Sequence, residues 1–149
     1  DPTNKPEEVD DAGVARLAAE ARAAGLKSVV LISSAGVTHP PAGEERFAKL
    51  MAGVMNAKLR GENALRASGV PYTVLRPVGL WDKPGGQFGI ALVAGDPGIG
   101  AMISRADVAA VAVHALADPA ARNKTAMILN IAHPQVDAWK SGFAALPGP

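Results

Sequence analysis

The sequence contains no cysteine among its 149 residues. This absence excludes disulfide bonds, thiol nucleophiles and cysteine-based zinc sites, and it leaves the redox compartment open. Aromatic residues make up only 4% of the chain. The core must therefore consist of closely packed aliphatic side chains, which suits helices packed on a sheet better than a β-sandwich.

Neither sign of charge dominates. The 15 basic and 14 acidic residues are interspersed and leave a formal net charge of +1. Such a chain has no electrostatic footprint for nucleic acid or for an anionic membrane. No apolar run approaches the length of a membrane-spanning helix. We therefore expect neither a nucleic-acid partner nor a membrane span.

The sequence does contain segments with helical spacing of apolar residues that alternate with short aliphatic runs typical of strands. Apolar residues make up 48% of the chain, enough for one domain over residues 1–149. The patterns predict helices over residues 9–24, 44–68, 105–117 and 135–145, and strands over residues 27–34, 71–80 and 125–132. This order predicts an α/β fold with parallel strands, because such strands need crossover connections.

Two of these segments carry specific expectations about burial. The aliphatic run Val29–Ile32 is typical of a strand that is covered on both faces. The helix predicted over residues 44–68 carries an apolar stripe, which we expect to face the core. Its members are Phe47, Leu50, Met51, Val54 and Leu65.

The stretch from residue 81 to 102 is rich in glycine and predicts a ligand-covering loop, with a short strand over residues 89–94. Residues 95–100 have the spacing G-x-x-G-x-G, but they include a proline and join no strand to a helix, which disfavours a phosphate loop. Ser104 and Asp107 predict a capping box for the next helix. The three histidines, His39, His114 and His133, lack metal-ligand spacing, and we expect them on the solvated surface.

Several polar residues stand where ligands bind in doubly wound sheets. Ser33 and Ser34 end one predicted strand, and Arg76 and Pro77 end the next. Each pair either contacts a ligand or completes an ordinary turn, with Arg76 on the surface in the second case. If Pro77 shapes a rim, it leaves neighbouring backbone groups free for an amide-bearing ligand.

Lys58 follows the apolar stripe of its helix by one turn, where an apolar residue is expected. Its ammonium group either reaches the strand ends to bind ribose hydroxyls or pairs with Glu62 at the surface. The spacing alone leaves both interpretations open.

Taken together, these motifs closely resemble the atypical short-chain dehydrogenases/reductases of the NAD(P)H-binding, NmrA-like type. The resemblance rests on residues 9–10, 23–34, 58–62, 68–77, 79–80 and 103–109, and it covers the carboxyl-terminal half of that family's domain. It implies a partial Rossmann-like, three-layer α/β/α fold with a mostly parallel sheet. The family's glycine-rich turn after its first strand, which seats the pyrophosphate, has no counterpart here.

The resemblance also implies roles for particular residues. Lys58 matches the position that binds the nicotinamide ribose, so Ser33, Ser34, Lys58, Pro77, Val78 and Gly79 are the implied cofactor-binding set, with NADP or NAD as the cofactor. The family's catalytic tyrosine and serine match Val54 and the region of Ala35. Because valine cannot donate a proton, reduction would need another proton source, as suits quinone-like, flavin-like or carbonyl-like acceptors.

Two functional hypotheses follow. The first is an NAD(P)H-dependent oxidoreductase, and the second is a non-catalytic Rossmann-like module that acts as a redox sensor, an assembly factor or an accessory subunit. Plant and cyanobacterial members look closest, which favours the cytoplasm or the plastid stroma. The chain begins at Asp1 rather than at methionine, so we expect a processed product or part of a longer protein. An incomplete sheet would need self-association or a protein partner to cover it.

Overall fold

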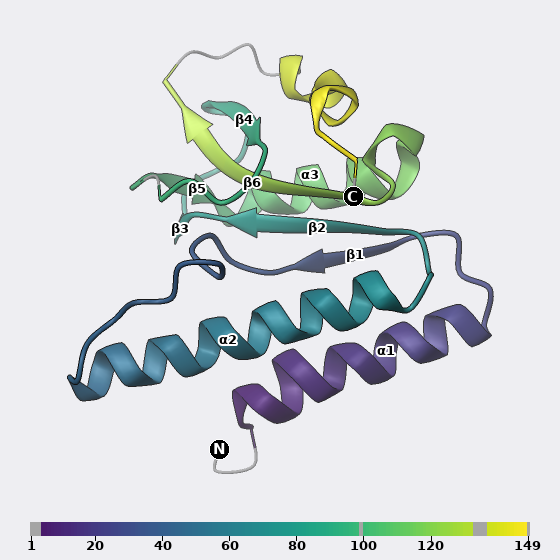
Figure 1. The fold of residues 1–149 in the computed structure, drawn as a ribbon. Helices are drawn as coiled ribbons and strands as arrows, with labels where there is room; N and C mark the ends of the chain where they lie inside the picture. Colours follow the sequence, from purple (N-terminus) through teal and green to yellow (C-terminus); the bar gives the residue numbers. More distant parts are fainter. Residues whose placement is uncertain (1–3, 99, 133–136, 149) are drawn as a thin grey trace.

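The structure is a computed structural model that describes residues 4–98, 100–132 and 137–148. Its elements follow the predicted alternation of helices and strands (Figure 1). In chain order they are η1 (Glu7–Asp11), α1 (Ala12–Ala23), β1 (Val29–Ile32), α2 (Arg46–Ala67), β2 (Tyr72–Pro77), β3 (Gly79–Trp81), β4 (Gly89–Val93), β5 (Met102–Ser104), α3 (Arg105–Ala117), η2 (Pro119–Ala121), β6 (Lys124–Ile131) and η3 (Ala138–Ala145).

Within the described ranges, the main sheet has the strand order β1-β2-β6-β4. Strands β1, β2 and β6 are parallel, and β4 runs antiparallel to β6. Helices α1 and α2 lie on one face of this sheet, and α3 lies on the other (Figure 1). The predicted three-layer α/β/α fold with a mostly parallel sheet is therefore confirmed.

Strand β1 is less buried than its aliphatic sequence predicts. It pairs with β2 only and forms one edge of the sheet. Val29, Val30 and Leu31 are half-buried, and Ile32 is 42% exposed. The expectation of a strand covered on both faces is therefore wrong for this chain, because nothing in the described residues lies beyond this edge.

The prediction that the apolar stripe of α2 faces the core is wrong for the first half of the helix. Phe47 and Leu50 are 72% and 61% exposed, whereas Leu65 is fully buried. The first turns of α2 extend past the ends of the strands (Figure 1), so their apolar side chains have no layer to pack against. The helix buries its second half instead, where Ala57 and Gly61 allow close packing.

The strand predicted over residues 71–80 is in fact two strands. Strand β2 ends at Pro77, and β3 pairs separately with β5 in a small parallel sheet. Pro77 cannot donate a backbone hydrogen bond, which is consistent with a break in the ladder at this point. The predicted short strand over residues 89–94 is confirmed as β4.

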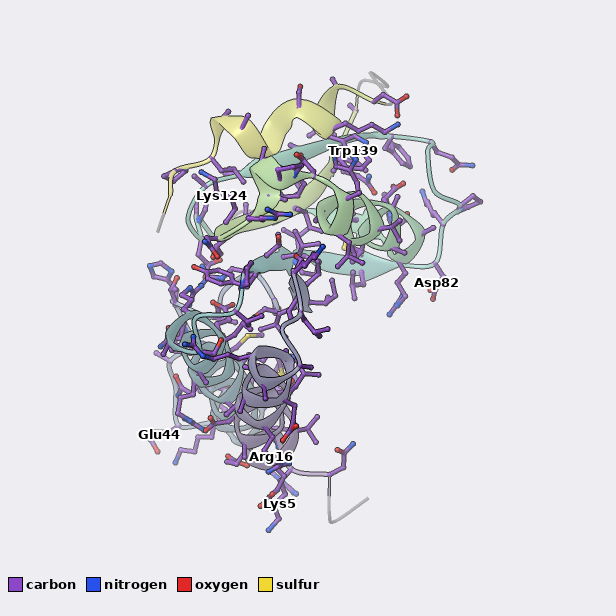
Figure 2. The ribbon with its side chains drawn as sticks, turned by 90° about the vertical axis from the view of Figure 1, so that its right-hand side faces the viewer. Lys5, Arg16, Glu44, Asp82, Lys124 and Trp139 are labelled. Atoms are coloured by element: carbon purple, nitrogen blue, oxygen red, sulfur yellow. The ribbon has the colours of Figure 1, made fainter. Side chains whose placement is uncertain are left out.

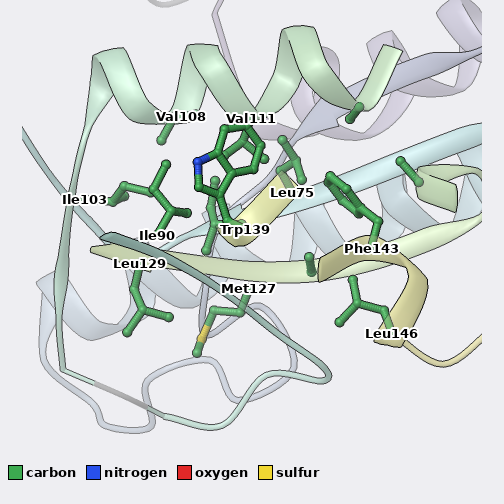
Figure 3. Packing of buried hydrophobic residues seen from close by; sticks show 14 of the residues in the cluster. Leu75, Ile90, Ile103, Val108, Val111, Met127, Leu129, Trp139, Phe143 and Leu146 are labelled. Carbon is green, nitrogen blue, oxygen red and sulfur yellow. The ribbon is translucent and has the colours of Figure 1, made fainter. Parts of the chain in front are cut away.

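The larger apolar core lies between the sheet and the layer of α3 and η3 (Figure 3). Leu75, Val111, Ile128 and Phe143 are completely buried in it. A smaller core lies between the sheet and α1 and α2; it contains Ala18, Ala21, Leu65, Val70, Tyr72 and Val74. Most of the well-packed interior is thus on the α3 side.

His114 is not the solvated residue that the sequence predicts. Its ring meets Trp139 edge-on at 5.1 Å, and its Nε2 lies 3.0 Å from the carbonyl oxygen of Lys140. Trp139 lies beside α3 (Figure 2), so His114 joins α3 to η3. His133 and the start of the helix predicted over residues 135–145 lie outside the described residues.

Two further expectations can be checked. The Ser104 hydroxyl caps α3 by accepting a 2.9 Å hydrogen bond from the Asp107 backbone N–H, so the predicted helix start is confirmed. The Asp107 carboxylate does not reach back to Ser104, because it accepts from Gly86 and Asn130. No helix among the described residues is long and apolar enough to cross a membrane.

Candidate functional site

A cavity of about 320 Å³ opens at the carboxyl ends of β1 and β2, and we call it the strand-end pocket. Three segments line it: residues 34–36 after β1, residues 77–79 after β2, and residues 96–98 and 100–101 of the glycine-rich stretch. In doubly wound sheets, ligands bind outside the carboxyl ends of the strands. The pocket therefore lies where the fold places a ligand.

The structure brings four of the six predicted residues together in this pocket. Ser34, Pro77, Val78 and Gly79 all line it. The remaining two, Ser33 and Lys58, lie beside a separate, much smaller cavity with Asp10. Successive side chains along an extended chain point to opposite faces, which explains how neighbouring serines serve different cavities.

Lys58 has a partner that the sequence did not suggest. Its Nζ lies 2.8 Å from the Oδ1 of Asp10 in η1, and its side chain is 24% exposed. The predicted surface pair with Glu62 is therefore wrong. Gly61 makes this approach of η1 to α2 feasible, because a Cβ at position 61 would overlap the Asp10 carbonyl oxygen.

Glu62 is instead fully buried and holds two arginines. Its carboxylate accepts hydrogen bonds of 3.0 and 2.7 Å from Arg76 and one of 2.7 Å from Arg66. Burial alone would raise the pKa of Glu62, but hydrogen bonds from Arg76 and Arg66, with the charge of Arg76, hold it below its ordinary value. Glu62 is therefore a carboxylate at neutral pH.

Arg76 is 5% exposed, so the interpretation of a surface arginine at a plain turn is wrong. Its guanidinium group binds Glu62 at two points, and its Nη1 also lies 3.9 Å from the Oδ2 of Asp96. Two N–H groups of the guanidinium bind one carboxylate side by side, and the positive charge of the guanidinium also faces a second carboxylate. Arg76 thus links α2 to the strand-end pocket.

The backbone of the pocket rim is already hydrogen-bonded. The Val78 N–H donates to Ile128, the Gly79 N–H donates to Ala101, and the Pro77 carbonyl accepts from Ala35. The expectation that these groups are free for an amide is therefore wrong. Gly79 has a packing role as well, because a Cβ there would stand 2.6 Å from the Met102 sulfur.

Asp96 is the residue of this site that the sequence did not reveal. It is 8% exposed, lines the pocket, and accepts hydrogen bonds from the Gly36 and Thr38 backbone N–H groups and from the Thr38 hydroxyl. Burial would raise its pKa, but these hydrogen bonds and the charge of Arg76 keep the pKa below its ordinary value. The only sequence signal was an acid within a glycine-rich run.

A tyrosine proton donor is absent from the pocket. The one tyrosine of the chain, Tyr72, begins β2 and is buried at the opposite end of that strand. The residue one turn before Lys58 is Val54. Among the described residues, no cluster of acids and histidines could hold a metal ion.

The remaining properties of the pocket suit a small polar ligand group. Its volume is at the lower end of the range for ligand sites. Small residues line it, and a Cβ at Gly98 or Gly100 would meet no protein atom within 4 Å, so packing does not require glycine there. The Ser34 hydroxyl donates to its neighbour's carbonyl, which leaves its oxygen able to accept.

Comparison with known proteins gives a consistent result. The family model described as NAD(P)H-binding matches residues 2–119. Sanguinarine reductase of Eschscholzia californica is 35% identical over 124 residues, which cover 80% of this chain and 44% of that protein. An uncharacterized chloroplastic protein of Arabidopsis thaliana is 37% identical over 117 residues, which cover 74% of this chain and 34% of that protein.

A solved structure extends this comparison to three dimensions. ChuY, described as an anaerobillin reductase from Escherichia coli O157:H7, is similar with a TM-score of 0.66 and 27% identity. The similarity covers 81% of this chain and 58% of that one. The chain spans less than half the length of the two curated relatives that it matches above.

Proposed function

Because this chain belongs to the NAD(P)H-binding family, an oxidoreductase-type family, we propose that it forms the nicotinamide side of an NAD(P)H-dependent reductase site. The observation that carries the proposal is the strand-end pocket, where four residues that the family resemblance implies line one cavity. In this proposal, residues 1–149 are one domain equivalent to the carboxyl-terminal half of a larger Rossmann fold. The rest of the protein would hold the pyrophosphate.

In this proposal, residues at two neighbouring cavities bind different parts of the cofactor. Pro77, Val78 and Gly79 form one wall for the nicotinamide ring, and Ser34 offers a hydroxyl oxygen to its amide. Lys58 and Ser33 serve the adjoining ribose, and Asp10 holds the Lys58 ammonium group until the ribose hydroxyls arrive. A bound NAD(P)H supplies a hydride at the pocket.

The lack of a tyrosine limits the acceptor that this site can serve. A carbonyl that becomes an alkoxide needs a proton donor at hand, and neither Val54 nor the distant Tyr72 supplies one. A quinone-like or flavin-like acceptor can take its proton from solvent after the hydride arrives. We therefore infer that such acceptors, or activated carbonyl-like compounds, are the substrates of this site.

Titration of the full-length protein with NADPH and NADH tests the role of Lys58. We expect Lys58→Ala to weaken binding about tenfold or more, because a charge-assisted hydrogen bond to the ribose is lost. Lys49→Ala is the matched control, since Lys49 lies on the same helix with a 60% exposed side chain and pairs only with Glu44 among the described residues. Equal affinities in the Lys58→Ala and Lys49→Ala proteins would remove Lys58 from the site.

A second function is favoured by a specific observation. Because the described part of the pocket holds no tyrosine, the domain could bind the cofactor without turnover and report its redox state to a partner. Assays of the full-length protein with NAD(P)H and a panel of quinones, flavins and carbonyl compounds separate the two functions. Turnover of any of these acceptors would exclude the non-catalytic function.

The plastid stroma is the compartment that we propose for this protein. The support is the resemblance to plant and cyanobacterial proteins and the chloroplastic relative described above. Imaging of the full-length protein fused at its carboxyl terminus to a fluorescent protein is the test. Fluorescence confined to the cytoplasm would contradict this compartment.

A further inference from the structure

Asp96 is a charged group whose position the proposed binding of the cofactor does not explain. It lies in the glycine-rich stretch, and its side chain is 2% exposed. Yet the residue lines the strand-end pocket. A buried carboxylate is costly unless it is well paired, so its presence in a ligand pocket calls for a reason.

The hydrogen bonds of the Asp96 carboxylate have a structural role. Its Oδ1 accepts a 2.7 Å hydrogen bond from Gly36, and its Oδ2 accepts bonds of 3.0 and 2.7 Å from the N–H and hydroxyl of Thr38. Asp96 thereby joins two walls of the pocket, the segment after β1 and the glycine-rich stretch. The same contacts hold it ionised.

Arg76, the arginine beside Asp96, is shared with a second carboxylate. Arg76 is 3.9 Å away, but it forms two shorter hydrogen bonds with Glu62, which Arg66 also binds. A further titratable group nearby is His39, whose Nδ1 lies 2.9 Å from the Thr38 hydroxyl oxygen. That hydroxyl donates to Asp96, so this contact needs a protonated Nδ1.

We propose that the Asp96 carboxylate makes this pocket bind the oxidised nicotinamide ring more tightly, relative to the reduced ring, than a neutral pocket would. The inference rests on the proposed function and deepens it. Loss of a hydride takes two electrons and one proton from the reduced ring and leaves it with one positive charge, while the acceptor gains the hydride and takes a proton from solvent. Asp96 attracts the charged ring and thereby also favours hydride donation.

The decisive quantity is the ratio of two dissociation constants, for NADP⁺ and for NADPH, measured by calorimetry on the full-length protein. We expect Asp96→Asn to weaken NADP⁺ binding relative to NADPH binding by about tenfold, the order for one partly screened charge near a cationic ring. Asparagine keeps the shape and one acceptor. The same pair of titrations with NAD⁺ and NADH covers the other cofactor.

Thr38→Val is the matched control for the structural consequence. It removes one hydrogen bond to Asp96 and loosens the pocket wall, but it leaves the charge in place. We expect any loss of affinity to affect both redox forms equally. An unchanged ratio in Asp96→Asn, or an equal change of ratio in Thr38→Val, would overturn the proposal.

A second pair of variants guards against misfolding of Asp96→Asn. Gly98 lines the same pocket, and a Cβ there meets no protein atom within 4 Å. Both substitutions crowd the pocket and lower the affinity for both redox forms, so the two size-matched variants are compared with each other: relative to Gly98→Met, Gly98→Lys should offset the charge of Asp96 and shift the ratio in the same direction as Asp96→Asn. Equal ratios in these two variants would count against the proposal, while a wild-type protein that binds neither redox form would refute the proposed function itself.

Discussion

The two faces of the sheet differ in how completely they are covered. On the α3 side, Val111, Ile128 and Phe143 are completely buried, and strand β4 forms the sheet edge beyond β6. On the α1 side the core is small, and β1 has an unpaired edge within the described residues. Stability therefore resides mainly on the α3 side of the sheet.

The strand-end pocket lies between these two regions. Two of its wall segments follow β1 and β2. The buried network of Glu62, Arg76 and Asp96 connects helix α2, on the α1 side, to the pocket. This arrangement holds the walls of the strand-end pocket in place beside the edge strand β1.

The largest expected effect comes from comparing a phenylalanine-to-alanine substitution on the α3 side of the sheet with one in α2 on the other side. Phe143→Ala removes a completely buried ring from the α3-side core and should lower the free energy of unfolding by about 3–5 kcal/mol. Phe47→Ala removes a ring that is 72% exposed and should change it by less than about 0.5 kcal/mol. Urea unfolding measures both, and similar losses would contradict the contrast.

Breaking the link between the two sides should have the next largest effect. Glu62→Gln leaves Arg76 and Arg66 without their shared carboxylate and should destabilise the fold by about 3 kcal/mol. A local surface role for Glu62 predicts instead a change below about 0.5 kcal/mol. Chemical denaturation at pH 7 separates the two.

The pH dependence of stability sharpens the same test. The pKa of Glu62 is lower in the folded protein than its ordinary value of about 4.5, so its contribution is fully present above that pH and is lost as the pH falls toward the folded-state pKa. Asp96 has the same sign of shift and adds to this loss. Denaturation between pH 5 and the lowest pH at which the wild type remains folded should show a steeper decline for the wild type than for Glu62→Gln.

The smallest effect concerns the exposed apolar surface beside β1. Leu17 is 53% exposed and borders two apolar grooves between α1 and β1. In an isolated 149-residue polypeptide, we expect a second copy to cover this surface, so that Leu17→Lys weakens self-association about tenfold. Leu116→Lys, at a position on α3 that is 55% exposed, is the control. Sedimentation that is identical for both variants would contradict this expectation.

The sequence predicted the elements well because local patterns determine them. The aliphatic runs, the glycines after helices and the Ser104 cap are all local signals, and most of the predicted elements lie within a few residues of their expected places, whereas the small sheet of β3 and β5 was not predicted. Burial was harder to predict, because it depends on neighbours. The aliphatic run of β1 resembles a central strand, yet it forms an edge here.

The same distinction between local patterns and long-range contacts applies to the residues of the candidate site. Ser34 and Pro77 were found because parallel strands bring their carboxyl ends together, a consequence of topology. Asp96 was missed because its partners, Gly36 and Thr38, are about sixty positions away in the sequence. The Lys58 pair with Asp10 was missed for the same reason, since helical spacing suggested Glu62 instead.

The central claim is that the strand-end pocket receives the nicotinamide ring, and blocking the pocket tests it most directly. Gly98 lines the pocket and a Cβ there has open space, so Gly98→Leu adds an apolar side chain at the pocket wall, and Gly148→Leu adds the same side chain near the carboxyl terminus, where a Cβ also has open space. Titration of both full-length variants with NADPH is the measurement. We predict that Gly98→Leu lowers the affinity at least tenfold while Gly148→Leu leaves it unchanged; equal affinities would contradict the claim.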